Sequence, residues 1–421
     1  MEYSVKKYIC KECKKEYIKE TSYKKHMNIK HSDEVLGLRP RCLKLTSENK
    51  KILFPKPILK WVGGKTQIIE KIISNFPVHM NNYHEIFLGG GSVLLTVLQY
   101  KKNGIITIGG NIYASDVNQP LIYVYKNIQS NHILLYEEIQ ILINIYKECT
   151  VSPSCGNEIN RKPKTFLEAT QSKENYYYWI RQQYNILTDK TSILCSAMFI
   201  FLNKTCFRGV FRIGPNGFNV PYGHYKNPEI INEEHLLEIH TLIQEVIFNV
   251  SDFNTSLSCV THIDDFVYLD PPYVPEKLNS FVGYSEHGFD KKEHIKLFSK
   301  FLVPPASGSG EATEPLADEI RDDRADSERV EQLPEGTSRV AKFTPLTVQP
   351  DFISDTSSVE KITTPLCNIL QNKIMMSNSD TELVRQYFSI DRYNIETILC
   401  KRTINSKNPK ATTQEIIIKN Y

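Results

Sequence analysis

Apolar positions along residues 55–130 form short runs that alternate with glycine loops and longer amphipathic stretches. YHEIFL is followed by GGGS and then by VLLTVLQY, and IYASD is followed by VNQPLIYVYKNI. Short apolar runs bounded by glycine predict strands, whereas apolar positions three or four residues apart predict helices. Their alternation predicts an α/β domain.

The same pattern returns after a different middle section. Residues 131–225 are mostly helical in pattern, rich in Tyr, Asn and Lys, and end in a glycine-punctuated loop. Residues 226–302 return to strands and helices around FVYLDPPY, and residues 359–421 place the helical TELVRQYF among strand-like runs. We therefore expect an α/β domain built from 55–130, 226–302 and 359–421, interrupted by a helical domain at 131–225.

One segment, 303–358, does not fit this pattern, because residues 304–345 contain no Asn, Tyr, Cys or His and only one Ile. Pro, Ser, Gly, Ala and acids dominate, a composition that cannot bury enough surface to fold alone. We interpret 303–358 as a disordered acidic insertion in a surface loop. Ten acids and five bases give residues 304–345 a charge of −5, so the net +3 of the chain leaves +8 elsewhere. A basic body favours a polyanionic partner such as nucleic acid.

The chain has no apolar run long enough to span a membrane, and its first residues lack the apolar stretch of a secretion signal. We therefore expect an intracellular protein that is not secreted, with cytoplasm, nucleus and viral factory left open. In a reducing compartment its ten cysteines are expected to be thiols or metal ligands.

Two glycine loops carry the first candidate chemistry. PILKWVGGKTQII places Trp61, Gly63, Gly64 and Lys65 just ahead of a helical pattern. Glycines let a backbone approach a ligand closely, and a helix N-terminus beside a lysine favours an anionic group.

The second loop, EIFLGGGSVLL, repeats the strand, glycine turn and helix typical of nucleotide-type cofactor sites, with Phe87, Gly89 and Gly91 as candidates. Asp116 ends the next strand, 25 residues after Gly91, near the spacing at which an acid binds a ribose in dinucleotide folds. Either loop alone is also compatible with a simple tight turn.

The tetrad Asp270-Pro271-Pro272-Tyr273 follows a buried-type strand. Proline cannot donate to a strand ladder, so the tetrad ends the strand and stiffens the turn. Alkylation of an exocyclic amine requires two acceptors for its N–H groups and a flat surface for the base. Asp270 and the Pro271 carbonyl are the candidate acceptors, and Tyr273 is the candidate stacking surface.

These motifs together resemble the Dam-type, or D12 class, of DNA adenine-N6 methyltransferases. The resemblance rests on the ordered runs KWVGGK, FLGGGS, the D-x-N of Asp116 and Asn118, FLNKTCFRGVFR, FNVPYGHYKNP, DPPY, SFVGYSEHGF, MMSNSD and IIIKNY. It covers roughly residues 55–302 and 359–421. It implies a Rossmann-like seven-stranded sheet, S-adenosylmethionine as cofactor, and a helical target-recognition domain between the cofactor and catalytic motifs.

Matched by position, the resemblance assigns Trp61, Lys65, Asp116 and Asp270 to the cofactor, and it assigns Asp270, Pro271 and Tyr273 to the flipped adenine. The substrate it implies is double-stranded DNA, methylated at adenine in a short palindrome such as GATC or CATG. SFVGY resembles the CATG-type relatives. A companion restriction endonuclease is a further partner that this reading leaves open.

Residues 201–228 have the composition of a DNA reader, because Arg and Asn suit base edges while Tyr can stack or hydrogen-bond. Arg208 stands where many relatives carry Asn, and the loop between Arg212 and Phe218 is one residue shorter, so the target sequence stays open. The candidate DNA-binding residues are Asn203, Lys204, Arg208, Arg212, Asn219, Pro221, Tyr222 and Tyr225.

Residues 1–31 match a C2H2 zinc finger, with Cys10-x2-Cys13, twelve residues, and His26-x4-His31. Two thiolates and two imidazoles can close a tetrahedral structural Zn²⁺ site, and a unit of this size needs such a crosslink. We expect a small ββα finger, joined to the enzyme by a basic linker at 32–54.

The sequence leaves two alternatives to adenine methylation. Cytosine-N4 methylation uses the same amine chemistry, but its enzymes usually open the tetrad with Ser, whereas Asp270 opens it here. The other alternative is an inactive DNA-binding protein in which the insertion has broken the catalytic domain, and the intact motifs argue against it.

Overall fold

The protein is described by a computed structural model. The described residues are 8–9, 16–17, 42–45, 51–149, 159–275, 289–301, 371–401 and 412–421. The four zinc ligands expected in the N-terminal finger and the acidic insertion 303–358 lie outside them.

Two antiparallel strand pairs lie near the N-terminus: β1 (Tyr8–Ile9) with β2 (Glu16–Tyr17), and β3 (Cys42–Leu45) with β4 (Lys51–Leu53). The second pair lies in the segment expected to be a linker.

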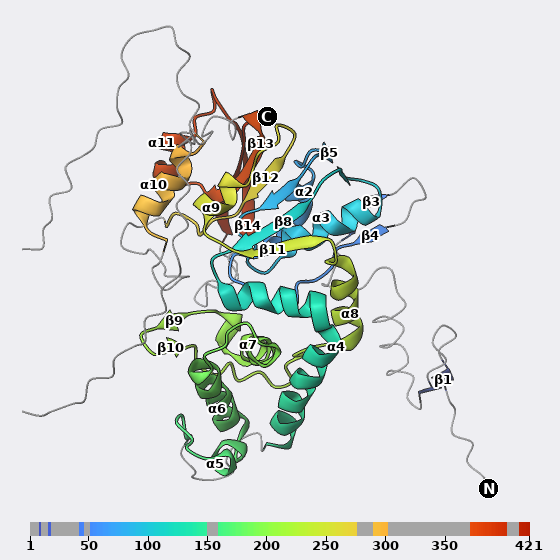
Figure 1. The fold of residues 1–421 in the computed structure, drawn as a ribbon, viewed down its shortest axis with the longest axis vertical. Coiled ribbons are helices and arrows are strands. Elements are labelled where there is room, and N and C mark those ends of the chain that lie inside the picture. Colours follow the sequence, from blue (N-terminus) through green and yellow to red (C-terminus); the bar gives the residue numbers. More distant parts are fainter. Residues whose placement is uncertain are drawn as a thin grey trace, which may run out of the picture. The chain divides into compact units, whose positions relative to one another are not determined.

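A mostly parallel sheet forms the centre of the described structure (Figure 1). Six of its strands run in one direction, and only β15, between β13 and β14, runs against them. In sheet order the seven strands are β11 (Val246–Val250), β8 (Ile112–Asp116), β6 (Tyr83–Glu85), β12 (Phe266–Leu269), β13 (Lys373–Ser379), β15 (Thr412–Lys419) and β14 (Asn394–Lys401).

Alternation along the strands divides the core into two faces, because successive side chains of a strand point to opposite sides of the sheet. In β12, Phe266 and Tyr268 belong to one apolar cluster, while Val267 and Leu269 belong to the other. All four side chains are buried, which explains why this strand reads as a continuous apolar run rather than an alternating one.

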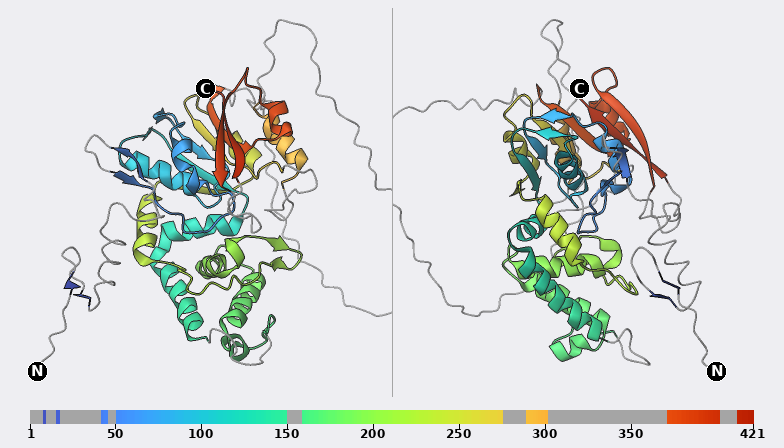
Figure 2. Two further views of the ribbon diagram at one scale, coloured as in Figure 1. Left: turned by 180° about the vertical axis from the view of Figure 1, so that it is seen from behind. Right: turned by 90° about the vertical axis from the view of Figure 1, so that its right-hand side faces the viewer.

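Helices cover both faces of the sheet (Figure 2). The first face packs against α2 (Ile69–Ile73), α3 (Ser92–Lys102) and α8 (Glu233–Leu242). The second face packs against α9 (Phe253–Ser258), α10 (Lys291–Ser299) and α11 (Glu382–Tyr387). Polar side chains cap the starts of three of these helices, since Asn232, Asp252 and Asp290 accept backbone N–H groups at the starts of α8, α9 and α10.

The helical section begins with α4 (Gln119–Glu148), which Asn118 caps and which bends at Asn131, where the backbone is not helical (φ −154°, ψ 61°). The bend lies where the pattern predicted the helical domain to begin. The remaining elements are α5 (Phe166–Thr170), α6 (Lys173–Ile186), α7 (Ile193–Thr205), the 3-10 turn η2 (Phe207–Gly209) and the hairpin of β9 (Ile213–Gly214) and β10 (Gly217–Phe218).

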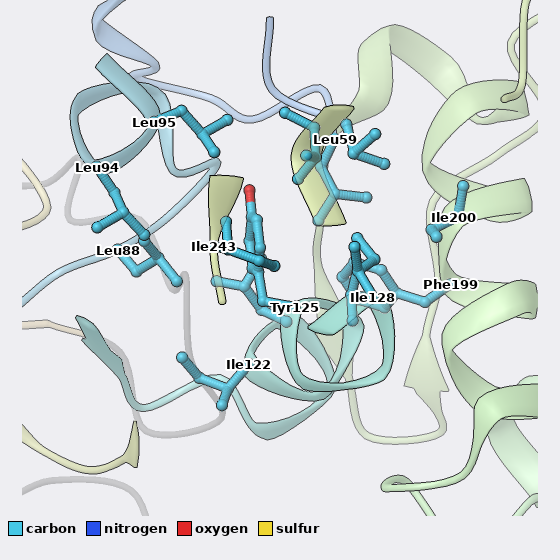
Figure 3. Packing of buried hydrophobic residues seen from close by; sticks show 14 of the residues in the cluster. Leu59, Leu88, Leu94, Leu95, Ile122, Tyr125, Ile128, Phe199, Ile200 and Ile243 are labelled. Atoms are coloured by element: carbon cyan, nitrogen blue, oxygen red, sulfur yellow. The ribbon is translucent and has the colours of Figure 1, made fainter. Parts of the chain in front are cut away.

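Helix α4 joins the two parts of this core (Figure 3). Its Ile122 and Tyr125 lie near Leu88 and Leu94, beside the sheet, whereas Ile128 lies toward Phe199 of α7. One apolar cluster therefore continues from the sheet into the helical section.

Two short parallel strands, β5 (His79–Met80) and β7 (Thr107–Ile108), form a separate pair beside the main sheet. Among the described residues, no helix combines the length and the apolar character needed to cross a membrane.

Candidate active site

The strand order identifies the edge of the sheet where a ligand site is expected. From β6 the chain moves outward through β8 to β11, and then returns to the other side of β6 as β12. In open α/β sheets, ligands bind beyond the carboxyl ends of the strands at such a reversal. The glycine loop follows β6, Asp116 ends β8, and the DPPY tetrad follows β12, so the predicted motifs meet at this edge.

The glycine loop is closed by Asp116. Gly89 N donates to Asp116 Oδ2 at 3.0 Å, and Asn118 N donates to Asp116 Oδ1 at 2.9 Å. Burial raises the pKa of Asp116, and these backbone N–H groups partly oppose that rise. Asp116 therefore holds the cofactor-type loop against the start of α4.

Two glycines of this loop leave no space for a side chain. A Cβ on Gly89 would lie 2.9 Å from the Trp61 ring, and a Cβ on Gly91 would lie 2.6 Å from Tyr125 Oη. Both have positive φ, +49° and +70°, which favours glycine. Phe87 points elsewhere, since its ring stacks on Phe253 of α9 at 6.2 Å.

The first glycine loop packs across the second. The Trp61 ring stacks on Phe199 of α7 and on Phe211, with centroids 6.5 and 5.8 Å apart. Gly64 N donates to Trp61 O at 3.2 Å, and Gly63 adopts φ +79°, so a tight turn leads into the 3-10 helix η1 (Lys65–Gln67). This aromatic stack connects the glycine loop to the helical section.

Lys65 turns inward and is 4% exposed. Its backbone N–H donates to Ser92 Oγ at 3.2 Å, and its Nζ donates to Gly63 O at 2.6 Å. Nζ also lies 2.8 Å from Asp270 Oδ1, an ion pair that joins the glycine loop to the DPPY tetrad.

The tetrad lies where β12 ends. Burial raises the pKa of Asp270 to about 6, the Lys65 ammonium opposes this rise, and the nearby Glu415 carboxylate adds to it. Pro271 is buried and Pro272 is half-buried. The Tyr273 hydroxyl donates to Glu415 Oε2 at 2.8 Å, and Lys65 Nζ lies 4.7 Å from the centre of the Tyr273 ring.

Several polar residues at this edge were missed by the sequence analysis. Glu85, the last residue of β6, is buried and accepts a hydrogen bond from Tyr83 Oη at 2.7 Å. Burial raises the pKa of Glu85 well above its ordinary value, and Asp270 adds to the rise. Tyr268 shares a hydrogen bond of 2.9 Å with Ser377 of β13. An acid at the end of a strand that precedes a glycine loop was the available signal for Glu85.

A pocket of about 240 Å³ opens beside Lys65, and residues distant in sequence line it. The first glycine loop forms one wall, Arg208 and Val210 come from the helical section, and Cys400 and Glu415 come from β14 and β15. The pocket therefore lies between the Lys65 loop, the C-terminal strands and the predicted DNA reader.

The candidate DNA-binding residues divide by exposure. Arg208, Arg212, Asn219 and Pro221 are exposed, and Arg212 Nε donates to Asn219 Oδ1 at 2.6 Å across the β9–β10 hairpin. Arg208 adopts φ +57°, an uncommon conformation for a residue with a side chain.

Lys204 and Tyr225 are half-buried beside Lys60. Lys60 Nζ lies 4.1 Å from the centre of the Tyr225 ring. Burial, together with the neighbouring Lys60 ammonium, lowers the pKa of Lys204 to about 8. The cluster of Lys60, Lys204 and Tyr225 is therefore partly desolvated in the protein alone.

Asn203 and Tyr222 are buried. The Asn203 side chain accepts from Lys60 N and donates to Lys60 O, both at 2.8 Å, and so joins α7 to the start of the first glycine loop. The Tyr222 hydroxyl pairs with that of Tyr146 in α4. Here both side chains make contacts within the protein, and their assignment to DNA contact stays a prediction.

No cluster of three or more His, Cys, Asp or Glu suited to a metal ion occurs among the residues that the structure describes.

Comparison with known proteins identifies the family. The family model described as D12 class N6 adenine-specific DNA methyltransferase matches residues 61–303, which include both glycine loops and the DPPY tetrad. A type II methyltransferase, M.MjaIII, of Methanocaldococcus jannaschii is 36% identical over 253 residues, or 58% of this chain and 78% of that protein.

Two further relatives come from bacteria. A type II methyltransferase, M1.LlaDCHI, of Lactococcus lactis is 27% identical over 277 residues, 64% of this chain and 85% of its own length. A DNA adenine methylase of Haemophilus influenzae is 28% identical over 236 residues, 56% of this chain and 70% of its own length. The matched family is adenine-specific, which favours the adenine reading of the tetrad over cytosine-N4. The chain therefore belongs to the D12 class of N6 adenine-specific DNA methyltransferases.

Proposed function

We propose that the loops at the carboxyl ends of β6, β8 and β12 are the active site for methylation of adenine N6 in a short palindrome of the CATG or GATC type. The observation that carries this is the approach of the two motif loops, with Lys65 Nζ 2.8 Å from Asp270 Oδ1 and Tyr273 beside both. The cofactor of the family, S-adenosylmethionine, supplies an electrophilic methyl group on a sulfonium.

The residues around the glycine loop suit that cofactor. Gly89 and Gly91 let the loop pack closely against Trp61 and Tyr125, Trp61 also offers an aromatic wall to the pocket, and Asp116 offers a carboxylate at the end of β8. Acidic side chains at this edge, Asp270 and Glu415 among them, favour a cationic sulfonium by charge.

The chain's own groups then orient the amine. Asp270 and the Pro271 carbonyl accept its two N–H hydrogens, and Tyr273 stacks on the extruded base. No covalent link between the enzyme and the base is needed, so positioning and electrostatics supply most of the acceleration. The exposed Arg208, Arg212 and Asn219 suit contact with base edges and phosphates.

Methylation of plasmid DNA by the purified protein, read by single-molecule sequencing, tests this function. We expect N6-methyladenine in one short motif, lost in Asp270→Asn, which keeps the shape of the side chain but removes its charge. Asp264→Asn is the matched control, because Asp264 is exposed at the opposite end of β12. A folded protein that binds DNA and methylates none would instead indicate an inactive DNA-binding protein.

The zinc finger at residues 1–31 is a second part of the proposal. The antiparallel pair β1–β2 flanks Cys10 and Cys13 in the sequence, as the ββα reading requires. We expect one Zn²⁺ per chain by elemental analysis, lost in the double variant Cys10→Ser/Cys13→Ser. A wild-type protein without zinc would contradict the proposal.

A companion restriction endonuclease remains part of the proposal. Protection of the methylated motif from a nuclease of the same source would support that partner, and cleavage at the methylated motif would count against it.

A further inference from the structure

Glu415 reaches the active-site edge because β15 runs antiparallel to its neighbours. Its register pairs Glu415 with Ser379, the last residue of β13, and with Ile398 of β14. The start of β15 therefore lies where the parallel strands end.

Alternation directs the Glu415 side chain toward the tetrad. Ile417 belongs to the same apolar cluster as Tyr268, so Glu415, two residues before Ile417, faces the same side as Asp270, two residues after Tyr268. The hydrogen bond of 2.8 Å from Tyr273 Oη to Glu415 Oε2 agrees with this direction.

The Tyr273 ring is thereby held at two points. Glu415 binds its hydroxyl, and the Lys65 ammonium lies 4.7 Å from its ring centre. Burial raises the pKa of Tyr273 well above its ordinary value, and the charges of Asp270 and Glu415 add to the rise, so the phenol stays a donor at neutral pH. A hydrogen bond from a neutral donor to a carboxylate is among the strong ones in proteins.

Orientation matters for a stacking surface more than for simple packing. A base held between acceptors can react only if its plane is fixed, and small displacements from the reactive geometry cost large factors in rate. Tyr273 follows two prolines on a turn rather than lying within a strand. The backbone of the next residue, Val274, is bonded to β13, and the hydroxyl contact adds a tie from the end of the Tyr273 ring to β15.

We propose that Glu415 is a positioning residue for methylation, which sets the plane of the Tyr273 ring beside Asp270 through the Tyr273 hydroxyl. This inference rests on the proposed role of Tyr273 as the surface on which the target adenine stacks.

The test uses the full chain and a duplex that carries the methylated motif, with DNA affinity and single-turnover methylation rate measured separately at pH 8. We expect Glu415→Ala to lower the rate about tenfold or more, with DNA affinity changed less than the rate, because a hydrogen bond to a charged group is lost. Glu415→Gln should retain most of the rate, since its amide oxygen still accepts from the phenol.

Tyr273→Phe removes the same contact from the other side. It should match Glu415→Ala, and the double variant Tyr273→Phe/Glu415→Ala should be no slower than either single variant, because one shared interaction is lost only once. Glu396→Ala is the matched control, since that carboxylate of β14 contacts Lys71 and Asn75 instead; its rate should not change.

Rates of Glu415→Ala and Tyr273→Phe within about twofold of wild type, or losses that multiply in their double variant, would overturn the role of Glu415. Tyr273→Ala separates this failure from a failure of the active-site proposal. If Tyr273→Ala is inactive and Glu415→Ala is unaffected, the proposed role of Tyr273 stands and only that of Glu415 is refuted. If Tyr273→Ala is active, the stacking role of Tyr273 is itself refuted.

Discussion

Two aspartates bracket β12, and their surroundings give them opposite properties. Burial raises the pKa of Asp265, but hydrogen bonds from His84, Asn81, Asn82 and His262 outweigh burial and hold it well below the ordinary value. Asp270 lies four residues beyond the start of the strand. It is buried, and the Lys65 ammonium opposes the effect of burial only in part, so its pKa rises to about 6. Asp265 therefore stabilises the fold, whereas Asp270 can still accept a hydrogen bond from a ligand.

Replacement of Asp265 by Ala should lower the free energy of unfolding by about 3 kcal/mol, because the buried His84 and the partly buried donors of Asn81 and Asn82 lose their acceptor. Denaturant unfolding measures this, with exposed Asp264→Ala as a control that should change stability by less than about 0.5 kcal/mol.

Because the folded pKa of Asp265 is lowered, its contribution to the free energy of unfolding is present above the ordinary pKa of 3.8 and is lost as the pH falls below that value. A gap between wild type and Asp265→Asn that does not narrow under acid would contradict this.

The methylation rate should rise with pH through about 6 and then level off, because protonation of Asp270 removes its charge and turns one of its two acceptor oxygens into a donor. The groups that set this pKa include Lys65 and Glu415, which act in opposite directions, and the charge of Asp270 is also felt at Glu85. Lys65→Met should therefore move the acid limb to higher pH, and Glu415→Gln should move it to lower pH. Single-turnover rates between pH 5 and pH 8 measure both shifts, and displacements in the same direction would refute the assignment to Asp270.

At the scale of elements, α3 is bounded by two glycines with nearly equal positive φ. Gly91, before its first turn, has φ +70°, and Gly104, just beyond its last turn, has φ +68°. A Cβ on Gly91 would meet Tyr125 Oη at 2.6 Å, whereas a Cβ on Gly104 would meet nothing within 4 Å. The first glycine is thus required by space as well as by backbone conformation.

Gly91→Ala should weaken S-adenosylmethionine binding at least about tenfold, because Tyr125 or the loop that its hydroxyl holds must move. Gly104→Ala shares the backbone strain of about 1–2 kcal/mol but should leave cofactor affinity unchanged. Calorimetric titration of both variants separates the two effects. Equal affinities in the two variants would show that the Tyr125 contact has no influence on the cofactor loop.

The helices, strands and loops could be predicted from the sequence more completely than the contacts between them. A continuous apolar run predicted β12, and the glycine turns predicted the loops at the end of β6 and before η1, because these features depend on local pattern. Glu415 was missed because the alternation of apolar and polar residues along a strand predicts which face of the sheet a residue occupies, but it does not predict which strand lies next to it. Asn203 was assigned to DNA from its residue type, whereas its burial against the Lys60 backbone depends on tertiary packing.

At the scale of the whole molecule, the first glycine loop and the predicted DNA reader are joined by direct contacts. The Asn203 side chain holds the backbone of Lys60, and the next residue, Trp61, stacks on Phe211 ahead of the β9–β10 hairpin. The cationic side chains of Lys60, Lys204 and Arg208 gather near this junction. The charge proposed to attract DNA therefore lies beside the groups proposed to read and methylate it.

The acidic segment should weaken that attraction. Residues 304–345 carry −5, and their removal leaves a chain of net +8. Deletion should tighten nonspecific DNA binding several-fold at low salt, and the gain should fade as added salt shortens the Debye length from about 30 Å at 0.01 M to about 8 Å at 0.15 M. Binding of a non-cognate duplex measured across salt concentrations tests this.

A segment of the same length, with its acids changed to amides and its five bases to Gln, separates charge from chain length. If charge is responsible, this neutral version should bind as tightly as the deletion, because both leave the same net +8. A neutral version that binds like wild type, beside a tighter deletion, would show that the length of the segment obstructs DNA and that its charge does not.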